Sequence, residues 1–319
     1  MNKRLSVQEI VGAFRTGDRR ALARVITIVE NSSEGRERLL DCAYAAGHGD
    51  CLILGITGAG GAGKSTLIDK VIQVYRSAGK TVGVLAVDPS SPYTGGAVLG
   101  DRIRMASHSM DSGVFIRSFA SRGAYGGISQ GAKDALYLYK AFGFDVIIVE
   151  SLGVGQAETD ISCFVDVTAV VLAPGNGDSI QLAKAGTQEI ADIFVINKAD
   201  RPEAETLFRQ MCAVLSAVPE PRRPKIIKTS AANDEGIEAL TLLFEQVRDE
   251  NRPKQGIKEK LRIENEIQTG AVRMFSEELS RHTSVLTGRV IAGKITPFAA
   301  AADLGSRLRI VPEKNQEEK

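Results

Sequence analysis

Apolar residues recur along this 319-residue chain in two different patterns. In the middle of the chain, short apolar runs alternate with amphipathic segments that have a helical period. The runs at 146–149 and 168–172 are apolar at successive positions, which is typical of strands buried on both faces of a parallel sheet. The alternation predicts an α/β fold with a doubly wound, mostly parallel sheet. We predict strands at 52–57, 82–87, 114–119, 146–149, 167–173, 193–197 and 225–229.

Both ends of the chain carry only the helical period. Spacings of three and four residues predict an N-terminal helical extension over residues 1–49, with turns at 15–18 and 31–33. The sheet domain is expected to occupy residues 50–252. Residues 253–319 predict a C-terminal helical arm that includes helices over 258–281 and 297–307 and a disordered polar tail.

The first predicted strand leads directly into a glycine-rich segment that fits the phosphate-binding pattern G-x-x-x-x-G-K-[ST]. Glycines let the backbone curl so that several N–H groups point at phosphate oxygens, and the helix predicted over 64–78 aims its positive N-terminus at the same anion. Lys64 is expected to contact the outer phosphates, and the Ser65 hydroxyl is expected to ligate Mg²⁺. A match to this pattern that lies between a predicted strand and a predicted helix rarely occurs by chance. It therefore favours a nucleotide-binding segment over a plain glycine turn. The predicted phosphate-binding residues are Gly58, Ala59, Gly60, Gly61, Ala62, Gly63, Lys64, Ser65 and Thr66.

A second apolar run, 193–196, ends at Asn197-Lys198-Ala199-Asp200. The Asp200 carboxylate can accept hydrogen bonds from both the N1–H and the exocyclic amine of guanine, whereas adenine would leave it unpaired. A third run precedes Thr229-Ser230-Ala231-Ala232, whose backbone N–H groups can reach the guanine oxygen. The order of the three segments predicts a GTPase. The predicted base-binding residues are Asn197, Lys198, Asp200, Ser230, Ala231 and Ala232.

Acidic residues between these segments are candidates for handling Mg²⁺, which prefers a few hard oxygen ligands. Asp88 and Glu150 each follow a predicted strand, at the edge where ligands bind in open α/β sheets. Asp101 lies in Leu99-Gly100-Asp101-Arg102. A helix cap or a solvated turn is the alternative role for each of the three carboxylates.

Glu150-Ser151-Leu152-Gly153 occupies the place where many GTPases carry D-x-x-G. Gly153 would donate its N–H to the γ-phosphate and let the loop change shape on hydrolysis. Gln156 can orient the attacking water, although a solvated side chain is the alternative. Hydrolysis would proceed by in-line attack of water, with catalysis by positioning and charge neutralisation. The catalytic candidates are Lys64, Glu150 and Gln156.

Composition narrows the class of protein. Apolar residues make up 43% of the chain, enough for a sizeable core, and the net charge of +1 gives no reason to expect a nucleic acid or a membrane surface as partner. The sequence shows no membrane span and no signal peptide, so we expect a cytoplasmic protein. The four cysteines form no C-x-x-C pair and the three histidines are far apart, which disfavours a soft-metal site.

Five segments together resemble one family. They are Asp88-Pro89-Ser90-Ser91, Thr94-Gly95-Gly96, Leu99-Gly100-Asp101-Arg102-Ile103-Arg104-Met105, Glu150-Ser151-Leu152-Gly153-Val154-Gly155-Gln156 and Asn197-Lys198-Ala199-Asp200. They are similar to the MeaB/ArgK family, the accessory GTPases of adenosylcobalamin-dependent methylmalonyl-CoA mutase. The likeness continues to Ile291-Ala292-Gly293-Lys294-Ile295-Thr296-Pro297 and so covers nearly the whole chain.

The resemblance implies properties that the residue patterns do not. It implies a homodimer held by the C-terminal arm, with Mg²⁺ handled by Ser65, Asp88, Asp101 and Glu150. It also implies that GTP binding and hydrolysis gate the delivery of adenosylcobalamin to the mutase and protect that enzyme. The chain departs from the family at Lys184-Ala185, where paired lysines are usual, and at 118–122. Because these segments are expected to signal to the partner, a related acyl-CoA mutase stays an alternative.

Two other functions are compatible with a phosphate-binding loop. A nickel-inserting metallochaperone GTPase would need clustered soft or imidazole ligands, and the scattered cysteines and histidines disfavour it. A kinase of a transport system would transfer phosphate to a protein or metabolite, and the guanine-selective segment disfavours that function.

Overall fold

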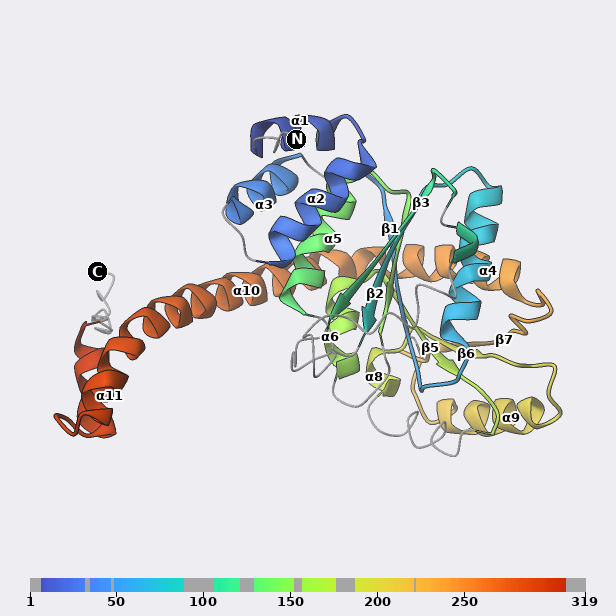
Figure 1. Ribbon diagram of the computed structural model, residues 1–319. Coiled ribbons are helices and arrows are strands. Elements are labelled where there is room, and N and C mark those ends of the chain that lie inside the picture. The colour runs from blue at the N-terminus through green and yellow to red at the C-terminus, as the bar shows by residue number, and fades with distance from the viewer. Residues whose placement is uncertain are drawn as a thin grey trace, which may run out of the picture. The chain divides into compact units, whose positions relative to one another are not determined.

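The chain is described from a computed structural model, shown in Figure 1. The structure describes residues 7–31, 35–46, 49–88, 106–108, 110–120, 129–151, 157–175, 187–220 and 222–307. It divides into two compact units, Met1–Lys258 and Glu259–Lys319.

The first unit is built on a seven-stranded sheet in the order β3-β2-β4-β1-β5-β6-β7. Every strand pairing is parallel, and β1, β4 and β5 are buried at every position. The α/β fold expected from the sequence is therefore confirmed. The strands are β1 (Leu52–Thr57), β2 (Val82–Asp88), β3 (Val114–Ala120), β4 (Val146–Glu150), β5 (Val167–Leu172), β6 (Ile193–Ile196) and β7 (Lys225–Lys228).

Helices cover both faces of this sheet (Figure 1). One face packs against α4 (Lys64–Ser77) and the first turns of α10 (Ile237–Ile291). The opposite face packs against α2, α5 and α6 over β1, β2, β3 and β4, and against α9 over β5 and β6. These helices are α2 (Arg19–Glu30), α5 (Gln130–Phe142), α6 (Ala157–Phe164) and α9 (Glu203–Leu215), and the short α8 (Gln188–Ile190) precedes β6.

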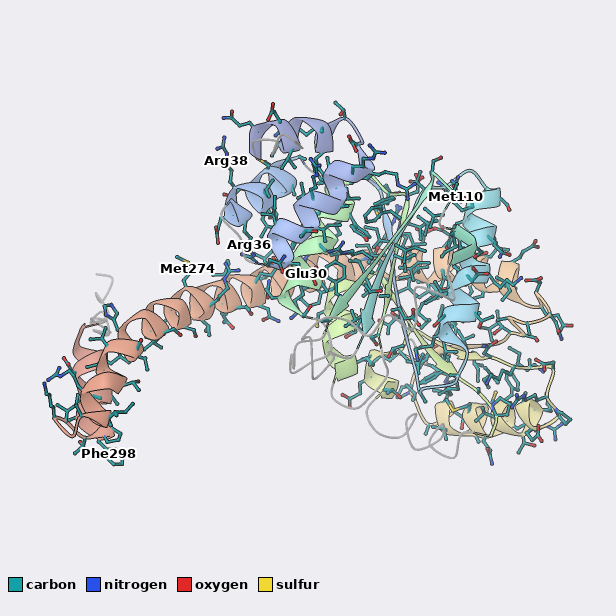
Figure 2. The ribbon with its side chains drawn as sticks, viewed as in Figure 1. Glu30, Arg36, Arg38, Met110, Met274 and Phe298 are labelled. Atoms are coloured by element: carbon teal, nitrogen blue, oxygen red, sulfur yellow. The ribbon has the colours of Figure 1, made fainter. Side chains whose placement is uncertain are left out.

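The N-terminal helices α1 (Val7–Arg15), α2 and α3 (Arg36–Ala45) are integrated into this unit. Asp18 caps α2 by accepting hydrogen bonds from the N–H groups of Arg20 and Ala21. Arg36, labelled in Figure 2, forms a buried ion pair with Asp134 on α5. Because both partners are buried, removing one would leave the other charge uncompensated.

The C-terminal helix is longer than the sequence pattern predicts. The expected helix over 258–281 is part of α10, which has 55 residues and runs through Pro253. Proline lacks an N–H and normally marks a helix boundary, yet α10 continues through Pro253. The boundary predicted between residues 252 and 253 falls inside this helix.

The second unit contains the remainder of α10 and α11 (Pro297–Arg307). Arg289 and Asp303 join the two helices through an ion pair at 3.5 Å. Throughout the part of the chain that the structure describes, no helix has both the length and the apolar character to cross a membrane.

Candidate nucleotide site

Two glycines of the phosphate-binding segment stand where a side chain would collide with the protein. Gly58 has φ +138°, and a Cβ there would lie 2.1 Å from the carbonyl oxygen of Val171 on β5. Gly63 has φ +89°, and its Cβ would lie 2.5 Å from Nδ2 of Asn197. The glycines are thus required both by backbone conformation and by close approach, of Gly58 to β5 and of Gly63 to Asn197.

The Lys64 ammonium lies inside the curl of this segment. Its Nζ donates hydrogen bonds to the carbonyl oxygens of Gly58 at 2.8 Å and Ala59 at 3.2 Å. Lys64 begins α4, whose first N–H groups have no partner within the helix and carry the positive end of its dipole. A side-chain cation and a helix N-terminus therefore converge here, as anion binding requires.

Ser65, near the end of the phosphate-binding segment, forms a polar pair with Glu150. The Ser65 hydroxyl donates to Oε1 of Glu150 at 3.1 Å, and Glu150 is buried. The two residues meet because β4 lies next to β1, with Glu150 in register with Ile56. A hydroxyl and a carboxylate are hard oxygen donors, so this pair fits Mg²⁺.

The ends of β1 and β4 are also joined directly behind this pair. The Ser151 hydroxyl donates to Oγ1 of Thr57 at 2.8 Å, and the Ser151 N–H donates to the carbonyl of Ile56 at 3.0 Å. Thr57 and Ser151 are both buried. These bonds join the carboxyl ends of β1 and β4.

Asn197 and Lys198 connect the predicted base-binding segment to the phosphate-binding segment. Asn197 Nδ2 donates to the carbonyl of Ala62 at 3.0 Å, and its Oδ1 accepts from the N–H of Ala231 at 3.2 Å. Lys198, which has φ +58°, donates through Nζ to the carbonyl of Gly61 at 2.7 Å. Three segments distant in sequence are thus held together at the carboxyl ends of the strands.

The carboxylate of Asp200 is held by Ser230. The Ser230 hydroxyl donates to Oδ1 of Asp200 at 2.6 Å, and this hydrogen bond lowers the pKa of the Asp200 carboxyl below its usual value. The side chain is exposed and ionised, as an acceptor for two guanine donors must be. The N–H groups of Ser230 and Ala231 bond to Glu235 and Asn197 respectively, so both are engaged within the protein here.

Some predicted site residues cannot be placed. Asp101, Gly153 and Gln156 lie outside the described residues. Asp88 ends β2, which puts its backbone at the same edge of the sheet as Glu150, but its side chain is not described. The residues that the structure brings together are the phosphate-binding segment with Ser65, Glu150, Asn197, Lys198, Asp200 and Ser230.

The hydrogen bonds from Asn197 and Lys198 to the phosphate-binding segment were not predicted from the sequence. Both were expected to bind the base, and nothing in the tetrapeptide indicates bonds to carbonyls more than 130 positions earlier. The relevant signal is three-dimensional, because β6 is separated from β1 by β5 alone.

Comparison with known proteins gives a consistent result. The profile of the family "Methylmalonyl Co-A mutase-associated GTPase MeaB" matches residues 22–285. A Pyrococcus abyssi protein named provisionally as a GTPase is 42% identical, covering 97% of this chain and 92% of that protein. GTPase ArgK of Escherichia coli is 37% identical, covering 74% of each chain.

More distant relatives extend the likeness. The mitochondrial methylmalonic aciduria type A homolog of Caenorhabditis elegans is 31% identical, covering 93% of this chain and 81% of that protein. The crystal structure of a LAO/AO transport system kinase has a TM-score of 0.64 and 25% identity, covering 96% of this chain and 99% of the other. The fold is that of a P-loop NTPase, and the relatives from Pyrococcus abyssi and Escherichia coli are named GTPases. The chain is therefore a guanine-nucleotide-binding GTPase, and it belongs to the MeaB family.

Proposed function

We propose that this GTPase is a chaperone of an adenosylcobalamin-dependent acyl-CoA mutase, most simply methylmalonyl-CoA mutase. GTP binding and hydrolysis would gate loading of the cofactor and protect the mutase from inactivation. The observation that carries this proposal is the match to the mutase-associated family over residues 22–285. The likeness to a methylmalonic aciduria protein over most of its length supports the same partner.

The described residues support a mechanism of positioning and charge neutralisation. The Lys64 ammonium would leave the carbonyls of Gly58 and Ala59 and contact the outer phosphates of GTP. The N–H groups at the start of α4 would stabilise the same charge. Asp200, kept ionised by Ser230, would select guanine by accepting from its N1–H and amine.

Ser65 and Glu150 would hold Mg²⁺, with Asp88 and Asp101 as further ligands. When bound, the ion would neutralise phosphate charge that develops during hydrolysis. The hydrogen bond between Ser65 Oγ and Glu150 Oε1 already holds these two oxygens together at a buried position. We place Gly153 at the γ-phosphate and Gln156 at the attacking water on sequence grounds alone.

We also propose that a second copy of this chain covers the second unit. The helices of the second unit expose five large apolar side chains, each by more than 60% of its surface: Ile267, Met274, Val285, Ile291 and Phe298. Figure 2 shows Met274 on α10 and Phe298 on α11. Large apolar side chains repeated along a helix pair are typical of a protein interface. A dimer held by this arm would bury them.

The partner is tested by single-turnover GTP hydrolysis with and without an adenosylcobalamin-dependent mutase. Stimulation of hydrolysis, together with GTP-dependent transfer of adenosylcobalamin to the apo-mutase, is the expected result. Serum albumin at the same concentration controls for nonspecific protein effects. A mutase that changes neither hydrolysis nor cofactor transfer would contradict the proposal.

The same preparation separates the two alternative functions. Tight binding of Ni²⁺ that depends on GTP would support a nickel metallochaperone. Transfer of ³²P from γ-labelled GTP to a protein or metabolite, in place of release as phosphate, would support a kinase. The chaperone proposal expects neither result.

A further inference from the structure

The three N-terminal helices and α5 enclose a cavity of about 180 Å³, which we call the N-terminal cavity. In Figure 1 the helices α1, α2 and α3 are gathered around α5, and they pack against one another. Voids larger than a water molecule, whose share of liquid volume is about 30 Å³, are few in protein interiors. A space several times that size is therefore large enough for a small ligand.

The inner part of the N-terminal cavity is apolar. Its lining includes four side chains that are each at most 7% exposed: Phe14, Val25, Leu39 and Leu138. An apolar cavity of this kind stays dry, and about 150 Å³ is enough to hold benzene. The inner part therefore fits a compact apolar group of about six carbons.

The outer part of the N-terminal cavity is formed by exposed residues. Arg15 is the last residue of α1, and Ala46 directly follows α3. Arg15 is also the one charged residue among the described residues that line the cavity. An arginine can cover apolar surface with its methylene groups while its guanidinium stays in water. The entrance of the cavity therefore carries a positive charge.

The Arg15 guanidinium forms no hydrogen bond or ion pair within the part of the chain that the structure describes. Two other arginines of these helices hold the fold together: Arg19 donates to the carbonyl of Asp111 at 3.0 Å, and Arg36 pairs with Asp134. A cation at the end of a helix is favoured by the helix dipole in any case. What points to a ligand is an unpaired cation at the entrance of an apolar cavity.

We propose that the N-terminal cavity binds a small monocarboxylate with a compact apolar body. The apolar body would fill the space beside Leu39 and Leu138, and the carboxylate would accept two hydrogen bonds from the Arg15 guanidinium. A single cation beside the negative end of the α1 dipole matches one negative charge better than a phosphate dianion. This site is separate from the nucleotide site, and the proposal does not depend on the mutase partner.

The probe is benzoate, which joins a benzene ring to one carboxylate. Its binding to the full-length protein is measured by isothermal titration calorimetry, with GDP and Mg²⁺ saturating so that the phosphate-binding segment is already occupied. The expected Kd is about 1 mM or lower, which about nine non-hydrogen atoms can supply. Benzylammonium, with the same ring and the opposite charge, should bind at least about tenfold more weakly. Absence of benzoate binding, or equal affinity for the two compounds, would overturn the proposal.

Substitutions separate the two parts of the site. Arg15→Gln removes the cation and should weaken benzoate binding at least about tenfold. Arg24→Gln is the matched control, because Arg24 is exposed on α2 and is not part of the cavity lining. Ala141→Leu fills the apolar part from α5 and should abolish binding, and Ala46→Leu narrows the entrance if that variant folds poorly. GTP hydrolysis at the native rate verifies that each variant is folded. Native affinity for benzoate in Arg15→Gln or in a filled variant would overturn the proposal.

Cys42 allows bound benzoate to be located. Its half-buried side chain lines the N-terminal cavity, whereas Cys212 on α9 is exposed and serves as an internal control. The rate of alkylation by iodoacetamide is followed at both residues by peptide mass spectrometry. Benzoate at about ten times its Kd should slow alkylation of Cys42 about tenfold and leave that of Cys212 unchanged. Equal rates at Cys42 with and without benzoate would place the bound molecule elsewhere and overturn the proposal.

Discussion

Lys64 stands where the phosphate-binding segment becomes the first turn of α4, and its ammonium already lies against two carbonyls of that segment. Lys64→Ala should weaken triphosphate binding and lower GTP hydrolysis by at least about 100-fold, because a preorganised cation is lost from a water-poor site. Lys70→Ala, a change on the same helix that removes a surface ion pair with Asp234, is the matched control and should hydrolyse GTP at the native rate. The rate of phosphate release under saturating GTP is measured for both variants. A native rate in Lys64→Ala would contradict the proposed phosphate site.

A substitution of Glu150 tests whether this residue binds Mg²⁺. Glu150→Gln keeps an oxygen that can accept from Ser65 but removes the charge that favours Mg²⁺. The half-saturating Mg²⁺ concentration for hydrolysis should rise about tenfold or more, with the Kd for GDP in EDTA little changed. A magnesium titration that superimposes on that of the native protein would contradict this role for Glu150.

Residues whose chemistry is local could be predicted from the sequence. The glycines and Lys64 belong to a pattern whose neighbours in the chain are also its neighbours in space. Bonds such as Ser65 to Glu150 and Asn197 to Ala62 depend instead on which strands are adjacent. The contacts of Ser107 and His108 with Asp69 had no sequence signal, because the two residues belong to no motif and lie 38 and 39 positions from Asp69.

At the scale of the element, Asp145 joins the starts of two strands. Its Oδ2 accepts from the N–H and hydroxyl of Thr81 at 2.7 and 2.8 Å, just before β2, while Asp145 itself precedes β4. The hydrogen bond from the Thr81 N–H lowers the pKa of the Asp145 carboxyl below its usual value. The bonded carboxylate stabilises the fold as long as it is ionised.

This arrangement predicts a pH-dependent effect of Asp145→Asn. A lowered pKa contributes stability above the unfolded-state pKa of about 3.9, and this contribution is lost as the pH falls through the folded-state pKa. The variant should therefore be less stable than the native chain near neutral pH, by about 1 kcal/mol or less at this partly exposed site.

Denaturant unfolding of the full chain at several pH values measures this difference. It should shrink as the pH drops below about 4. Asp41→Asn, at an exposed position on α3, serves as the control. A stability difference that is the same at every pH would show that charge is not the cause.

Strands were predicted more accurately than the long helix. Strands such as β1 and β5 are short apolar runs that are buried at every position, so burial on both faces determines them locally. The extent of α10 was missed because Pro253 divides a polar stretch that has no strong apolar period. A helix of this kind is specified by its tertiary contacts more than by local pattern.

At the scale of the whole molecule, the exposed apolar residues of the second unit predict self-association. Met274→Glu places a charge among them and should shift the chain from dimer to monomer. Met110→Glu is the matched control, because Met110 is even more exposed, at 94% against 69%, but lies on the first unit. Sedimentation equilibrium at micromolar concentration distinguishes the two forms. A native chain that is monomeric under these conditions would contradict the proposed dimer.

The family match assigns the chain to mutase-associated GTPases, but the partner surface was not predictable from the described residues. Of the segments in which the sequence departs from the family, residues 118–120 end β3, whereas residues 121–122 and 184–185 lie outside the described part of the chain. The proposed selection of guanine can be argued from physical chemistry, since it would depend on the Asp200 carboxylate and on the Ser230 hydroxyl that bonds to it.

The most direct test is therefore equilibrium binding of GDP, ADP and XDP to the native chain and to Asp200→Asn, by isothermal titration calorimetry. The native protein should bind GDP at least about 100-fold more tightly than ADP. Asp200→Asn should lose affinity for GDP and gain it for XDP, because its amide can donate to the carbonyl that replaces the guanine amine. Equal affinity of the native chain for GDP and ADP, or undiminished GDP binding by Asp200→Asn, would contradict the account.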